Sequence, residues 1–131
     1  LNNYKMGTMA CNIHLKKDFK NKNLVKVITK DKISHRKTSY AKGFLREINF
    51  MQGVNIYHHI GIYLYRVDTL KKFISYKKTK NEKKFKLEQL RALENKIPIS
   101  VYFTKSKPIG VDTPEDFKKV KKLMEKKNNI I

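Results

Sequence analysis

The sequence has little cysteine, few acidic residues and no long apolar run, and each shortage excludes a class of protein. Its single cysteine, Cys11, rules out an internal disulfide and suits a reducing compartment. No apolar run approaches the roughly 20 residues that span a bilayer, and residues 1–5 lack the apolar core of a signal peptide. We therefore expect a soluble, cytoplasmic protein that meets no membrane. Because the first residue is Leu1 rather than methionine, we also expect the true beginning to lie further upstream.

The signatures of several enzyme classes are absent as well. The sequence contains no Walker glycine loop, no GxGxxG, no zinc-ligand spacing and no nucleophile elbow. His58 and His59 are adjacent within an expected strand, so their side chains face opposite ways and do not form a metal pair.

Basic residues far outnumber acidic ones, with 31 Lys and Arg against 11 Asp and Glu, for a net charge of +20. One interpretation is a small basic nucleic-acid-binding module, with tyrosines and phenylalanines for base stacking. The other is a lysine-rich solvated surface. The second is favoured because the lysines are spread over most of the chain, so nucleic acid is not the expected partner.

The length of 131 residues and a hydrophobic content of 40% predict one modest domain with a core. Apolar, β-branched runs predict strands, and apolar residues at helical spacing predict helices. Residues 1–23 show only a short turn near 15–19. Residues 30–55 show neither the two-residue repeat of a strand nor the 3.6-residue repeat of a helix. Residues 77–84 are expected to be a connection. The predicted order is strand 24–29, strand 57–66, helices 68–74 and 87–94, strand 97–104 and a helix from 114. This order favours an α/β layer over a bundle or barrel.

The expected strand 57–66 has two distinguishable faces. Alternation assigns Ile60, Ile62 and Leu64 to the core. The opposite face would carry His59, Gly61, Tyr63 and Tyr65. Gly61 would leave a gap over which a small polar ligand could touch its neighbours, or it could simply admit a crossing backbone.

The run Gly110–Asp116 joins the last strand to the last helix. Thr113 is the expected N-cap, Pro114 the first helical residue, and Asp116 the partner in a capping box. Asp112 is not needed for capping, and it lies where α/β sheets bind ligands. The alternative is a second acidic cap that favours the helix dipole.

Glu88 and Gln89 lie off the apolar stripe of the expected helix 87–94. Glu88 can form an ion pair with Arg91 three residues on. Alternatively, the two neighbouring side chains could hydrogen-bond a hydroxyl-rich ligand.

Three motifs together are more specific than any one of them: His59–Arg66, Leu87–Glu94 and Gly110–Asp116, in this order. They resemble the carboxy-terminal half of the CMP-KDO synthetase family, the 3-deoxy-manno-octulosonate (KDO) cytidylyltransferases of lipopolysaccharide biosynthesis. Upstream, Met6–Ala10 and Asn23–Val27 resemble that family too.

The resemblance implies an α/β, partial nucleotide-diphospho-sugar transferase fold: a mixed sheet flanked by helices, without the amino-terminal nucleotide-binding part. It implies that residues 1–131 are a single partial domain, with a divergent segment at 32–55. The family converts CTP and KDO to CMP-KDO and pyrophosphate with Mg²⁺, and a homodimer is a further implication.

The resemblance also assigns roles to residues. Asp112 would be a magnesium ligand, and no other catalytic residue is implied. His59 and Tyr63 would line the sugar site, and Glu88 and Gln89 would hold hydroxyls of the sugar.

The chain departs from the family at two places. The family's Tyr-Phe-Ser-Arg segment should fall within 32–48, where its arginine has no assigned counterpart. The family also has an acidic run before the helix that corresponds to 87–94. Residues 77–85 take its place here, and Glu82 is the one acidic residue that remains. We therefore expect a fragment with little activity alone, or an inert remnant.

Overall fold

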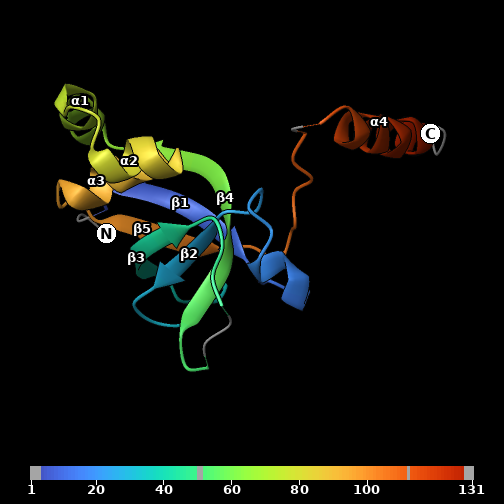
Figure 1. Ribbon diagram of the computed structural model, residues 1–131, viewed down its shortest axis with the longest axis horizontal. Helices are drawn as coiled ribbons and strands as arrows, with labels where there is room; N and C mark the ends of the chain where they lie inside the picture. Colours follow the sequence, from blue (N-terminus) through green and yellow to red (C-terminus); the bar gives the residue numbers. More distant parts are fainter. Residues whose placement is uncertain (1–3, 50–51, 112, 129–131) are drawn as a thin grey trace.

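The computed structural model describes residues 4–49, 52–111 and 113–128. Five strands, four α-helices and a 3₁₀ helix occur in this part of the chain (Figure 1). Their order is β1 (Met6–Cys11), η1 (Lys16–Phe19), β2 (Lys26–Thr29), β3 (Ser39–Leu45), β4 (Asn55–Tyr65), α1 (Val67–Ser75), α2 (Lys80–Phe85), α3 (Gln89–Glu94), β5 (Ile99–Phe103) and α4 (Pro114–Asn128).

The strands form one mixed sheet that closes on itself in the order β1-β4-β2-β3-β5. β1 and β5 are parallel and the other neighbouring strands are antiparallel. The α/β class is confirmed, but the expectation of a layer rather than a barrel is wrong. The ring closes where Ser39 and Tyr40 of β3 pair with Val101 and Ser100 of β5. β3 lies within residues 30–55, where hydrophobic residues show no regular spacing. The sequence therefore did not predict the strand that closes the barrel.

Two further elements were not predicted. Residues 1–23 were expected to hold only a short turn, which is present as η1, yet β1 pairs with both β4 and β5. Its Met-Gly-Thr-Met-Ala-Cys sequence has weak strand propensity, and burial between two neighbours stabilises it instead. The expected connection 77–84 contains α2, which begins with a Thr79–Glu82 capping box.

The predicted faces of β4 are reversed toward its end. Ile62 and Leu64 are 60% and 74% exposed, whereas Tyr63 and Tyr65 pack against the core. A small closed barrel is filled by its inward side chains, and the larger aromatic rings occupy that space here. The apolar face of the next helix, α1, is only partly buried. Phe73 lies in the core, whereas Leu70 and Ile74 are exposed.

The helices lie in two places (Figure 1). α1, α2 and α3 gather at one end of the barrel, while α4 stands apart beyond an extended segment, residues 104–111. Among residues 4–49, 52–111 and 113–128, no helix combines the length and apolar character needed to cross a membrane.

Candidate functional site

A hollow of about 830 Å³ opens beside the middle of β4. We call it the β4 hollow. Segments far apart in the sequence line it: Asn21 and 23–25 before β2, Arg46 after β3, 58–63 of β4, Lys86, Leu87 and Gln89 around the start of α3, and 107–110 with Asp116. The hollow therefore brings together three of the predicted sugar-site residues, His59, Tyr63 and Gln89.

A β-bulge shapes the β4 wall of this hollow. β1 residues Thr8 and Met9 are paired with Tyr63 and Ile60, so two residues of β4 are left without a partner on β1. A regular strand would separate positions 59 and 63 by about 13 Å. The bulge brings the rings of His59 and Tyr63 to a centroid distance of 5.6 Å.

A hydrogen bond between His59 and Thr8 favours one tautomer of the histidine. The Thr8 hydroxyl lies 2.8 Å from His59 Nε2 and donates its only proton to backbone carbonyls, at 2.8 Å to Ile62 O and 3.2 Å to Ile60 O. With the proton placed on a carbonyl in this way, the hydroxyl oxygen accepts from an Nε2–H of the imidazole. In the neutral ring, Nδ1 keeps its lone pair and can accept a hydrogen bond from a ligand hydroxyl.

Burial keeps both aromatic groups of the pair uncharged at neutral pH. Desolvation, aided by the neighbouring His58, lowers the pKa of His59 to about 4. Desolvation, with Tyr65 and Glu88 nearby, raises the pKa of Tyr63 above its ordinary value. The pair offers a neutral acceptor and a neutral hydroxyl, which suits recognition of a polyhydroxylated ligand.

The lowered pKa of His59 predicts that stability falls as the solution becomes acidic. Below pH 6.5 the histidine becomes protonated in the unfolded chain. In the folded chain it stays neutral down to about pH 4. From pH 7 to pH 5 this group should cost about 2 kcal/mol of unfolding free energy. Urea unfolding at the two pH values measures the loss, and His59→Gln should reduce it. An equal loss in the variant would contradict the assignment.

Gln89 and Glu88 have different environments in the structure. Gln89 is 6% exposed and lines the β4 hollow. Glu88 is not among the lining residues; its side chain is 69% exposed and lies 3.4 Å from Arg91, as the ion-pair alternative predicted. Glu88 is still near the site, because its charge contributes to the raised pKa of Tyr63.

The bidentate pair of Glu82 and Arg91 holds α3 in place behind the hollow. Arg91 Nη2 lies 2.6 Å from Glu82 Oε1, and Arg91 Nε donates to Glu82 Oε2 at 2.9 Å. The two side chains are 9% and 7% exposed. The Arg91 guanidinium also lies over the Phe73 ring, 4.6 Å from its centroid. These contacts fix the helix that carries Gln89.

Arg46 lines the hollow and was missed from the sequence. Phe44-Leu45-Arg46 keeps the Phe-x-Arg spacing of the expected Tyr-Phe-Ser-Arg segment, and this spacing could have located it. Its guanidinium donates to three backbone carbonyls, those of Phe85 at 2.8 Å, Lys86 at 3.0 Å and Lys22 at 3.2 Å. Arg46 therefore ties the end of β3 to the turn between α2 and α3.

The predicted metal ligand, Asp112, lies outside the described residues. The capping box beside it is confirmed: Asp116 N–H donates to the Thr113 hydroxyl, and Thr113 N–H donates to the Asp116 carboxylate, both at 3.2 Å. Within the part of the chain that the structure describes, no three His, Cys, Asp or Glu side chains gather to hold a metal ion. These residues therefore do not by themselves fit a magnesium site.

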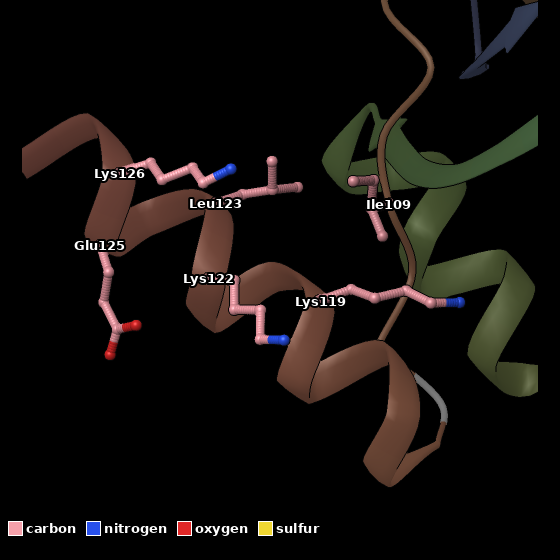
Figure 2. A pocket seen from close by; sticks show the side chains of 6 residues that line it. All are labelled: Ile109, Lys119, Lys122, Leu123, Glu125 and Lys126. Carbon is pink, nitrogen blue, oxygen red and sulfur yellow. The ribbon is translucent and has the colours of Figure 1, made fainter.

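A second hollow, of about 560 Å³, lies between α4 and the segment that leads to it. Figure 2 shows Lys119 and Leu123 extending from α4 toward Ile109. The six residues that line it are all exposed, and none is buried enough to hold a ligand group rigidly. The β4 hollow is the better candidate.

Comparisons with known proteins agree on one family. A family model described as cytidylyltransferase matches residues 1–100. The chain is 39% identical over 132 residues to the 3-deoxy-manno-octulosonate cytidylyltransferase of Thermodesulfovibrio yellowstonii, covering 93% of this chain and 49% of that protein. It is 35% identical over 125 residues to the enzyme of the same name from Bartonella tribocorum, covering 91% and 48%.

A solved structure gives the same result in three dimensions. The structure of CMP:2-keto-3-deoxy-manno-octonic acid synthetase in complex with CTP superposes with a TM-score of 0.78 and 27% identity. The match covers 95% of this chain and 51% of that one. The chain thus spans about half the length of the curated relatives it matches, and it aligns with their carboxy-terminal half.

Proposed function

The chain belongs to the cytidylyltransferase family, and we propose that it carries the sugar-acid half of a 3-deoxy-manno-octulosonate cytidylyltransferase site. The substrates would be KDO and CTP, and the products CMP-KDO and pyrophosphate. The observation that supports this most is the β4 hollow, where a bulge holds two neutral hydrogen-bonding rings, His59 and Tyr63, beside Gln89.

In this proposal the chain binds and orients the sugar. His59 Nδ1 accepts from a sugar hydroxyl, Tyr63 and Gln89 supply further hydrogen bonds, and Gly61 leaves room for the ring. A hydroxyl of the held sugar then attacks the α-phosphate of CTP, and pyrophosphate leaves. Such a displacement depends on positioning, so a bound and oriented sugar is the contribution of these residues. Glu88 lies at the edge of the hollow, and its proposed role is to act on the bound sugar through its negative charge.

Nucleotide binding is proposed to depend on the half of the family enzyme that the chain does not span. Asp112 is proposed to give one oxygen ligand to Mg²⁺, a cation that prefers oxygen donors. The remaining ligands would come from outside the described residues. We therefore propose that the chain has little activity alone.

Gly61→Ala tests the sugar site without disturbing the fold. A Cβ at Gly61 would meet no heavy atom within 4 Å, so the new methyl group would occupy the space proposed for the sugar. We expect the affinity for KDO to fall about tenfold or more, equivalent to about 1.4 kcal/mol. The measurement is isothermal titration calorimetry.

Gly43→Ala is the matched control, because a Cβ at Gly43 of β3 also meets nothing within 4 Å and Gly43 does not line the hollow. Both variants should keep or slightly raise the melting temperature, since alanine restricts the unfolded chain. Equal KDO affinity in the two variants would contradict a sugar site at Gly61.

A further inference from the structure

We propose that Lys86 recognises the carboxylate of the sugar acid. This inference rests on the proposed function and adds a residue to it. The bound molecule is an acid, whereas the groups so far assigned to the site, His59, Tyr63 and Gln89, are neutral hydrogen-bonding groups. A cation on the wall of the hollow is needed to distinguish the acid from a neutral sugar.

Three of the residues that line the β4 hollow have cationic side chains: Arg46, Lys86 and Lys107. The Arg46 guanidinium is committed to three backbone carbonyls. The Lys107 ammonium lies 3.3 Å from the carboxylate of Asp18, which already neutralises it. Among the described residues, no carboxylate lies within ion-pair distance of the Lys86 ammonium. Lys86 is therefore the cation that remains available to a ligand.

The backbone at Lys86 makes the assignment testable by substitution. Lys86 is the C-cap of α2 in the left-handed conformation, with φ 53° and ψ 48°. Glycine is the residue that adopts this conformation most easily, because it has no Cβ. A lysine here is less favourable for the fold than glycine. Replacing Lys86 with glycine should therefore remove the cation without harming the turn.

The turn is also held firmly enough to direct the side chain. Arg46 donates to the carbonyls of both Phe85 and Lys86, and the next residue, Leu87, is 4% exposed in the core. These contacts anchor the main chain on both sides of the Lys86 Cα. The side chain can then extend into the hollow beside Gln89, which lies three residues further on.

Lys86→Gly separates the two roles, since it relieves the left-handed backbone and removes the cation. In the full 131-residue chain we expect a melting temperature equal to or above that of the unmodified protein. We also expect a roughly tenfold loss of affinity for KDO. Affinity for the same sugar with its carboxylate reduced to an alcohol should not change. Lys86→Gln keeps the strained backbone without the charge and should show the same loss for the acid.

Lys96→Gly is the matched control. Lys96 is the other non-glycine residue with positive φ among those described, at 60°, and it does not line the β4 hollow. It should gain stability as Lys86→Gly does, with unchanged affinity for KDO.

Two results would overturn the inference about Lys86 alone. One is unchanged KDO affinity in both Lys86 variants, and the other is an equal loss for the acid and for the reduced sugar. If the unmodified chain bound neither sugar, the proposed function would fail and the inference with it.

Discussion

Incubated with CTP, Mg²⁺ and KDO, the 131-residue chain should release pyrophosphate no faster than a protein-free control. Nucleotidyl transfer requires both substrates to be held in line, and correct positioning is worth many orders of magnitude in rate. The β4 hollow can hold the sugar, but the described residues offer no set of three metal-binding side chains. The chain also spans only 49% of its relative from Thermodesulfovibrio yellowstonii. The measurement is a coupled pyrophosphate assay.

The full-length Thermodesulfovibrio yellowstonii protein is the positive control for this assay. Co-expression of the chain with the amino-terminal half of that protein should raise pyrophosphate release above background, provided that the two halves associate. Turnover by the isolated chain within tenfold of the full-length control would contradict a division of the site between two halves.

Glu82→Gln should lower the free energy of unfolding by about 3 kcal/mol. The change leaves the buried Arg91 guanidinium without the partner that now contacts it twice, and the exposed Glu88 at 3.4 Å cannot replace it. Arg91 also lowers the pKa of Glu82, so the pair is charged at neutral pH. For a chain of this length the melting temperature should fall by roughly 10 °C. Because α3 carries Gln89, KDO affinity should fall as well.

Glu125→Gln is the control for this prediction. The Glu125 carboxylate lies 3.9 Å from Lys121 and both side chains are more than half exposed, so its loss should cost less than about 0.5 kcal/mol. A cost for Glu82→Gln as small as that of Glu125→Gln would show that the buried pair does not hold α3.

The elements that sequence reasoning recovered are those whose signal is local. Runs of β-branched residues located β2 and β5, and the Thr113–Asp116 capping box located the start of α4. β1 and β3 were missed because their strands are stabilised by neighbours on both sides, not by their own composition. The pairing that closes the barrel between β3 and β5 depends on residues about 60 positions apart.

The site was recovered only in part, for a similar reason. His59, Tyr63 and Gln89 were predicted from the polar faces of the expected strand and helix together with the family resemblance, and the structure brings them to one hollow. Their roles stay predictions. The bulge, the Thr8 bond to His59 and the left-handed Lys86 depend on tertiary pairing, so no local pattern shows them.

The measurement that tests the sugar-acid site most directly is an NMR titration of the chain with KDO, following backbone amide shifts. We expect saturable shifts confined to the β4 hollow, at Gly61, Tyr63, Lys86 and Gln89. The amides of Gly43 and Lys96, which lie outside the hollow, should not move. An absence of shifts at millimolar KDO, or shifts clustered away from the β4 hollow, would contradict the assignment of this chain as the sugar-binding half of a cytidylyltransferase.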